Sequence, residues 1–460
     1  MEQARLNPMD LFLPLRAEEE GDWLDECFVA PEGFERLMGE RSVVVFGRPG
    51  AGKSALCRML ERRAQESRRL AVRWSPLGSS LLSEMSLTDL LAEAFDACGL
   101  ALLEYLVRSV AFEALPSWAR QMLRWFIHRF VRGNLYARAG PFLFSESVFP
   151  QTAAFSRTRR IPSQAMLLAP PKKDLLPPND YPLILAELSK ALRAAGLEGL
   201  WILVDIGGIG DEATSGLVAS LGRLLSALPL FERGGFSWKL FLPSRLEAQL
   251  VGLGGLERRR LDCFRLEWEI PALRQIVERR LALATGDPSP RLEDLCSAPA
   301  WLPWLEKVGG AIPREWLEQV RPVLERYLSD RCPVDEATWR TLRRKYPPRL
   351  YLDEAEEVLL VGGREIPLSE LSGHPLDLLR YLYPRANRTV SRPELYFRAC
   401  RGLPAIPRVP DDEGYEEEAN YRGLLDTALW RLRRAIEPDP GDPVLLRTLR
   451  GQGVRLEVRW

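Results

Sequence analysis

The chain has 460 residues, and its 63 lysines and arginines balance 63 aspartates and glutamates, so the formal net charge is zero. This balance excludes a basic nucleic-acid coat protein and an acidic disordered tail protein. Hydrophobic residues make up 46% and charged residues 27%, which are ordinary globular values, and the length suggests about two to four domains.

Cysteine and histidine usage limits the chemistry. The seven cysteines are odd in number and none has metal-knuckle spacing, so neither a disulfide framework nor a zinc site is expected. The two histidines, His128 and His374, do not favour a Ser-His-Asp hydrolase. The N-terminal residues lack a secretory pattern, and charges interrupt the most apolar stretch, residues 100–131. We therefore expect a cytoplasmic protein with no membrane partner.

The strongest motif is a glycine-rich loop between a predicted strand and a predicted helix. Residues 42–46 (SVVVF) are typical of a buried parallel strand, and residues 47–54 (GRPGAGKS) follow directly. Gly47, Gly50 and Gly52 would let backbone N–H groups surround phosphate oxygens, beside the positive end of the next helix.

Two side chains complete this phosphate loop. Lys53 would reach the β- and γ-phosphates of ATP, and Ser54 would hold Mg²⁺. A triphosphatase also needs an acidic residue at the end of a neighbouring strand. Asp205 follows five apolar residues at 200–204 and would bind Mg²⁺ through water.

The position after Asp205 departs from the usual pattern. Enzymes that activate water in this way commonly have an acidic residue there, but this chain has Ile206. The nearest acids are Asp211 and Glu212, which either cap the helix predicted to begin near Thr214 or fold back over the site. We therefore expect slow hydrolysis.

Further strands are predicted at residues 70–74, 238–242 and 263–268, with a helix at 272–284. The strand at 238–242 ends in Pro243-Ser244-Arg245, and Arg245 could bind the γ-phosphate through two hydrogen bonds. We expect Lys53, Asp205 and Arg245 to act together in catalysis.

These residues resemble the signal-transduction ATPases with numerous domains (STAND), which are relatives of the AAA+ class. The resemblance covers about residues 20–330. It implies a helical lid whose turn contains Gly-x-Pro, and residues 310–314 (GAIPR) are similar with one extra residue. By this resemblance, Pro313 touches the nucleotide, Arg314 is a second sensor, and residues 28–34 hold the adenine-contacting loop without its usual Gly-Arg.

The phosphate loop and Asp205 are separated by a large insert, at about residues 80–180. Residues 86–131 are typical of two or three helices, and residues 140–178 are rich in proline and serine and predict an extended loop. The aromatic residues of the helical part form either a local core or a surface for a partner or a second copy: Trp118, Trp125, Phe126 and Phe130.

After Pro347-Pro348 the pattern changes. Three short strands are predicted at 349–352, 357–361 and 364–368, with Gly362-Gly363 forming a hairpin turn. Helices are predicted at 375–382, 392–400 and 421–437, followed by a hairpin at 445–458.

This order resembles the winged-helix output domain of the OmpR class of response regulators. The match is closest at residues 432–438 (LRRAIEP) and 448–456 (TLRGQGVRL), where the family usually has Tyr in place of Val454. The resemblance implies that helix 421–437 enters the major groove of duplex DNA, that Thr448 contacts a phosphate, and that Arg450 on the wing reaches a phosphate or the minor groove.

The local charges leave the partner of this helix open. The periodicity of helix 421–437 predicts a buried face of Leu425, Ala428, Leu429, Leu432 and Ile436. The side chains left more exposed are Arg422, Trp430, Arg431, Arg433 and Arg434. Residues 422–455 hold seven basic and four acidic residues, which gives +3 and suits phosphate contacts. Acids precede the helix and would repel DNA near the groove: Asp411, Asp412, Glu413, Glu416, Glu417 and Glu418. Bulky Trp430 suits a protein partner better than a base edge.

The sequence thus predicts an α/β fold: a P-loop NTPase parallel-sheet domain (1–270) with a helical insert, a helical lid (271–346) and an α+β winged-helix domain (349–460). It favours a regulatory switch that binds ATP and Mg²⁺ and controls DNA or protein binding, with homo-oligomer formation. By resemblance, such switches serve stress or phage-defence signalling. The alternatives are a transcription regulator with ATP-tuned assembly and a scaffold with a degenerate nucleotide site.

Overall fold

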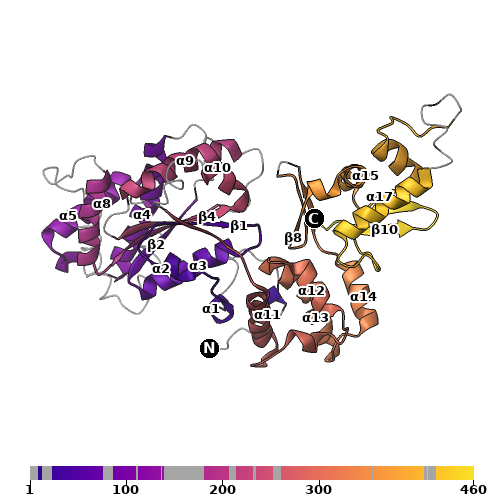
Figure 1. Ribbon diagram of the computed structural model, residues 1–460. Coiled ribbons are helices and arrows are strands. Elements are labelled where there is room, and N and C mark those ends of the chain that lie inside the picture. Colours follow the sequence, from indigo (N-terminus) through magenta and orange to yellow (C-terminus); the bar gives the residue numbers. More distant parts are fainter. Residues whose placement is uncertain are drawn as a thin grey trace. The chain divides into compact units, whose positions relative to one another are not determined.

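The computed structural model (Figure 1) describes residues 9–12, 23–75, 86–109, 112–135, 137–138, 181–206, 214–231, 235–251, 261–354, 356–408, 412 and 421–459. These residues divide into two compact units. Residues 30–266 form the sheet unit, and residues 267–459 form the C-terminal unit together with the described residues 9–12 and 23–29.

The sheet unit contains a five-stranded parallel sheet, with the order β2-β3-β4-β1-β5. The strands are β1 (Val43–Gly47), β2 (Arg69–Trp74), β3 (Gly199–Asp205), β4 (Phe236–Pro243) and β5 (Asp262–Arg265). Residues of β1, β3 and β4 are buried on both faces, as in parallel strands that are covered by helices. The predicted α/β class with a parallel sheet is confirmed.

The side chains of β1 alternate between the two faces of the sheet, and different helices cover each face. Val44 and Phe46 of β1 join the core built with the helices α4 (Leu87–Ser109), α5 (Ser117–Phe130), α8 (Tyr181–Ala194) and α9 (Thr214–Phe231). The intervening Val43 and Val45 point to the other face, since side chains alternate along a strand. In Figure 1, α2 (Phe34–Met38) and α3 (Lys53–Glu66) lie on the face opposite α4, α8 and α9.

The helical insert packs through its aromatic residues. Trp125, Phe126 and Phe130 are buried in the core of the sheet unit, so for these three the local-core interpretation is confirmed. Trp118 at the start of α5 is 49% exposed. The loop predicted at 140–178 lies outside the described residues, as do Asp211 and Glu212.

Strand β5 is shorter than the predicted strand 263–268. Among the described strands it pairs with β1, and β1 ends at Gly47, where the chain turns into the glycine-rich loop. The pairing therefore stops at Phe46 and Arg265. Just beyond this point, the Leu266 amide still donates to the Phe46 carbonyl at 2.7 Å.

The first part of the C-terminal unit is helical. It contains α11 (Ile270–Thr285), α12 (Trp301–Gly309), α13 (Pro313–Asp330) and α14 (Glu336–Lys345), which we call the four-helix segment. The short N-terminal elements η1 (Asp10–Phe12) and α1 (Leu24–Cys27) pack on α11, where the Arg280 guanidinium donates to the Leu11 carbonyl at 2.6 Å.

The second part, residues 349–459, is called the α+β segment. It begins with an antiparallel sheet of β6 (Leu350–Asp353), β7 (Val358–Val361) and β8 (Arg364–Pro367). The helices α15 (His374–Leu382), α16 (Arg392–Glu394) and α17 (Tyr421–Ile436) follow. A hairpin of β10 (Leu446–Leu449) and β11 (Gly453–Leu456) pairs with β9 (Thr389–Val390).

One predicted helix changes type within its length. Residues 392–400 begin as α16, but Leu395–Cys400 form a π-helix in which the Arg401 amide donates to the Tyr396 carbonyl five residues back, at 3.0 Å. The wider turn accompanies the burial of Tyr396 and Phe397 against Tyr421 of α17, with ring centroids 5.3 and 5.6 Å from it. Among the described helices, none has the length and apolar character that crossing a bilayer requires.

Candidate functional site

The glycine-rich loop leaves the carboxyl end of β1 and enters α3. Gly50 and Gly52 have φ angles of 81° and 96°, and Gly52 is the N-cap residue of α3. These left-handed conformations favour glycine because a Cβ atom would strain them. A Cβ on Gly47 would lie 3.3 Å from Cγ of Lys53 and 3.3 Å from Cβ of Leu266. The loop therefore depends on glycine for both its conformation and its packing.

Lys53 is the first residue of α3 and is only 8% exposed. Its Nζ atom donates hydrogen bonds to the carbonyl oxygens of Gly47 at 2.6 Å and Arg48 at 2.9 Å. Ser54, the second residue of the helix, is half-buried. The cation, the hydroxyl and the helix N-terminus therefore meet at one loop, which suits an anionic phosphate group.

The sheet brings Asp205 and Arg245 to the same edge as this loop. Asp205 ends β3 and lies opposite Phe241 of β4, and Phe241 lies opposite Val45 of β1. Arg245 lies in a 3₁₀ turn, Ser244–Leu246, directly after β4. Because the three strands are parallel, their carboxyl ends share one edge of the sheet. Both side chains are half-buried there.

This set of groups fits a nucleotide with Mg²⁺. Mg²⁺ is usually held by one or two carboxylates and by substrate phosphates, and Ser54 with Asp205 could supply a hydroxyl and a carboxylate. The loop glycines leave room for backbone N–H groups to approach phosphate oxygens, as the left-handed residues Gly50 and Gly52 indicate.

One cation at this edge was missed by the sequence interpretation. Arg265 ends β5, next to β1, and its guanidinium forms an ion pair of 2.7 Å with Glu247 of α10 (Glu247–Val251). The predicted strand extended past this residue to 268, which made Arg265 an internal strand residue. Only the true strand end places it at the carboxyl edge.

The two predicted lid residues begin helix α13. Ile312 is its N-cap residue, Pro313 is the buried first helical residue and Arg314 is half-buried. Both belong to the C-terminal unit, whereas the phosphate loop belongs to the sheet unit. Their contact with a nucleotide stays a prediction. The same holds for residues 28–34, of which Phe28 accepts a hydrogen bond from Arg279 of α11.

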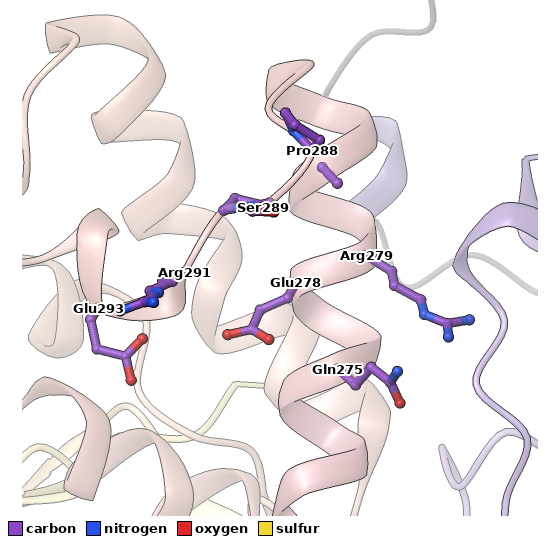
Figure 2. Close-up of a pocket in the computed structure, with 9 residues that line it drawn as sticks. Gln275, Glu278, Arg279, Pro288, Ser289, Arg291 and Glu293 are labelled. Carbon is purple, nitrogen blue, oxygen red and sulfur yellow. The ribbon is translucent and has the colours of Figure 1, made fainter.

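A pocket of about 680 Å³ lies on α11 and the segment that follows it (Figure 2). Figure 2 shows Glu278 pointing toward the side on which Arg291 and Glu293 lie, whereas Arg279 points away from them. The lining side chains carry both signs of charge, and none of them was predicted as a site residue.

The exposed side of α17, together with the hairpin β10–β11, forms a second candidate surface. Arg422, Arg431 and Arg434 are exposed, as predicted, and so are Thr448 and Arg450 of the hairpin. Arg433, which was also predicted to be exposed, is half-buried because it packs against the hairpin. Large apolar side chains share this helix face, since Leu424 is 56% and Trp430 54% exposed.

Several contacts organise this face. Arg433 of α17 donates hydrogen bonds to the Thr448 hydroxyl at 3.0 Å and to the Leu446 carbonyl at 3.2 Å, which joins the helix to the hairpin. Arg434 lies over the ring of Trp430, 5.3 Å from its centroid. Asp426 forms an ion pair with Arg392, so its charge is neutralised nearby.

A buried carboxylate sets the geometry between α17 and β10. Glu437 is fully buried, and its oxygens accept hydrogen bonds of 2.6–2.9 Å from the amides of Val444, Leu445 and Leu446. Burial raises the pKa of this carboxyl. In the sequence, Glu437 is one residue of the stretch 432–438 that resembles the OmpR class, and the helical periodicity of this region did not predict that its side chain is buried.

No known family model matches the chain. Over 146 residues it is 31% identical to the sensory transduction protein RegX3 of Mycobacterium leprae, which covers 31% of this chain and 61% of that protein. It is 32% identical over 148 residues to protein PetR of Rhodobacter capsulatus, which covers 31% of this chain and 53% of that protein. The chain thus spans between half and two thirds of the length of these curated relatives.

Two solved structures are weakly similar. Cdc6p from Pyrobaculum aerophilum shares 13% identity with a TM-score of 0.35, over 98% of this chain and 94% of its own. The ORC2 protein of Aeropyrum pernix, solved as ADPNP–ADP complexes, shares 16% identity with a TM-score of 0.35, over 91% of this chain and 85% of its own. This likeness is too weak to assign a function.

Proposed function

We propose that the chain is an ATP-binding regulatory switch whose nucleotide state controls a DNA-binding winged helix. The observation that carries the nucleotide part is the position of Lys53, Asp205 and Arg245 around one edge of a parallel sheet. The RegX3 proteins are sensory transduction proteins by name, and the local similarity supports a regulatory output.

The phosphate loop would act by exchanging hydrogen bonds. Lys53 donates to the Gly47 and Arg48 carbonyls, and on binding it would turn its ammonium group to the β- and γ-phosphates. Ser54 and Asp205 would hold Mg²⁺, which supplies positive charge to the phosphates when it is bound. Arg245 would detect the γ-phosphate. By resemblance, Arg314 would be a second sensor and Pro313 would touch the nucleotide.

Slow turnover follows from the residue after Asp205. Ile206 is fully buried and has no group that could accept a proton from water. ATP would therefore persist in the site long enough to act as a signal. A signal of this kind needs the bound and free states to differ in the arrangement of a second element.

The α+β segment would be that second element, in the form of a winged helix. Helix α17 would enter the major groove with Arg422, Arg431 and Arg434 exposed for phosphates and bases. Thr448 accepts from Arg433, which leaves its own O–H group able to donate to a phosphate. Arg450, in the exposed hairpin turn, would reach the next phosphate or the minor groove.

A protein partner is the second candidate for the same face. The exposed Leu424 and Trp430 favour it, because large apolar side chains are enriched where proteins bind each other. Trp430→Ala separates the two. A DNA-binding helix should lose little affinity for duplex DNA, whereas a protein-binding helix should lose most of its binding to the partner.

Two further proposals concern assembly and role. ATP would change the oligomeric state of the chain, and by resemblance the switch would serve stress or phage-defence signalling. A scaffold with a degenerate nucleotide site is the competing interpretation. Hydrolysis that Asp205→Ala abolishes would contradict the scaffold.

One experiment tests the main proposal. The mass of the particle and its affinity for random duplex DNA are measured with and without ATP, at several salt concentrations. We expect ATP to change at least one of the two, and DNA affinity to fall as salt rises because bound counterions are released. Affinity that is independent of salt would exclude phosphate recognition.

A further inference from the structure

Within the C-terminal unit, the four-helix segment and the α+β segment meet through their backbones. A Cβ atom on Gly363 would lie 1.8 Å from the carbonyl oxygen of Gly309, and one on Gly310 would lie 2.6 Å from the carbonyl oxygen of Gly363. A Cβ on Gly362 would lie 2.3 Å from the Val308 carbonyl oxygen. Only glycine permits this approach of the β7–β8 turn to the end of α12.

Hydrogen bonds cross the same contact between the β7–β8 turn (residues 362 and 363) and the end of α12 (residues 308–310), which we call the joint. The Gly363 amide donates to the Val308 carbonyl at 2.8 Å, so the two backbones are bonded directly. Lys307 of α12 donates to the Pro438 carbonyl at 2.5 Å, and Arg364 of β8 donates to the Ala435 carbonyl at the end of α17 at 2.5 Å. The turn is therefore fixed both to α12 and to α17.

Ion pairs connect the two segments at two further places, from α14 to the residues after α17 and from α13 to the residue before β6. Arg343 of α14 has a side chain that is only 4% exposed and pairs with Asp442 and, at 3.7 Å, with Asp439. Arg349, next to β6, pairs with the buried Glu318 of α13 at 2.6 Å. Each set of ion pairs contains one buried charged side chain, Arg343 or Glu318. Separating the partners is costly, because the buried charge would be left unpaired in a medium of low dielectric constant.

The linker between the segments adds no freedom. Pro347 and Pro348 are both buried, and each proline fixes its own φ angle and restricts the residue before it. From the sequence this Pro-Pro pair marked a domain boundary. In the structure the two segments on either side of this boundary are held together by the glycine contact, the hydrogen bonds and the ion pairs.

We propose that the described residues between 270 and 459 form one rigid output arm, in which the four-helix segment and the α+β segment move only together. Helix α13 begins with Pro313 and Arg314 and carries Glu318, which holds Arg349 beside β6. A force applied at the start of α13 would therefore move α17 without an intervening hinge. This consequence for signalling rests on the proposed function, whereas the rigidity of the arm does not.

Hydrogen exchange at the Gly363 amide tests the arm directly, since this amide is bonded across the joint. In the full chain, without and with ATP, we expect its exchange to be slowed to within about tenfold of the amide of Leu379 in the core of α15. An amide that exchanges at the unprotected rate in either condition would overturn the proposal.

A variant pair adds a second measurement. Gly363→Ala should open the joint and speed exchange at residues 362–364 by at least about tenfold, because a Cβ has no room there. Gly423→Ala on α17 is the matched control, since nothing lies within 4 Å of its Cβ position. If Gly363→Ala folds and exchanges as slowly as the control, the glycine contact does not hold the joint.

The outcomes separate this inference from the proposed function. A chain that fails to bind ATP but protects Gly363 refutes the nucleotide switch and leaves the rigid arm standing. A chain that binds ATP and loses protection at Gly363 on binding refutes the rigid arm and leaves the switch standing.

Discussion

The Nζ atom of Lys53 lies 2.6 Å from the carbonyl oxygen of Gly47, the residue that ends β1. The side chain thus folds back over its own loop, and this conformation favours glycine at residue 47, because a Cβ there would lie 3.3 Å from Cγ of Lys53. A cation held at the start of a helix can pass to a phosphate with little rearrangement.

Removing this cation should abolish most of the nucleotide affinity. Lys53→Ala should weaken ATP binding by about 10- to 100-fold, which corresponds to the loss of one charge-assisted hydrogen bond. Isothermal titration calorimetry of the full chain measures the effect. Lys190→Ala is the control, because Lys190 is exposed on α8 and pairs with Glu187 of the same helix at 2.7 Å. Equal affinity of the two variants would contradict the phosphate-loop assignment.

The exposed arginines of α17 should set the salt dependence of DNA binding. Replacing both Arg431 and Arg434 with alanine should reduce the slope of log affinity against log salt by about 0.9 for each phosphate that the protein no longer neutralises. Arg340→Ala is the control, since Arg340 is exposed on α14 and pairs with Glu336 one turn away at 2.9 Å. A slope that stays at the wild-type value would show that α17 does not bind phosphates.

The ion pair of Arg343 should contribute to stability. Arg343→Ala should lower the free energy of unfolding by about 1–3 kcal/mol, because Asp439 and Asp442 lose a buried partner while Arg344 still holds Asp442. Loss of the guanidinium packed 4.6 Å from the Trp339 ring centroid adds to this. Urea unfolding measures the difference, and Arg340→Ala on the same helix should change it by no more than about 0.5 kcal/mol.

The buried carboxyl of Glu315 should make stability depend on pH. Burial, and the nearby Glu318, raise the pKa of Glu315 from 4.5 to about 7, against the opposing effect of Arg349, Arg314 and Arg459. Between these two values the folded chain holds a proton that the unfolded chain has lost. The contribution of Glu315 to the free energy of unfolding should therefore be complete below pH 4.5. It should decrease as the pH rises to about 7, by about 1.4 kcal/mol for each unit of pKa shift.

Glu315→Gln removes the titrating group and should flatten this part of the stability profile. At pH 8 the variant should be more stable than the wild type by up to about 3 kcal/mol, and the advantage should vanish near pH 4.5. Chemical unfolding at several pH values measures it. Glu325→Gln, at an exposed position of the same helix, should leave the profile unchanged, and a flat wild-type profile would refute the prediction.

The sequence pattern was sufficient to predict a structural element where neighbouring residues alone determine its conformation. The run Val43–Gly47 followed by Gly50 and Gly52 predicted both the strand and the loop, because an unbroken apolar run and glycines that tolerate left-handed conformations can be recognised from neighbouring residues. The periodicity of residues 421–437 likewise predicted α17 and its buried face. Pattern was insufficient at β5, whose end depends on where its neighbour β1 turns away.

By itself, the sequence determined the glycine-rich loop, the parallel strands, and the exposure of Arg422, Arg431 and Arg434, although it wrongly predicted that Arg433 is exposed. Only the tertiary structure decided that Arg265 ends a strand, that Glu437 is buried on three amides, and that the Pro-Pro boundary is a packed joint. The physical reason is the range of the interactions. Periodicity and glycine conformations act over a few residues, whereas Gly309 and Gly363, or Arg343 and Asp442, meet only after the chain has folded.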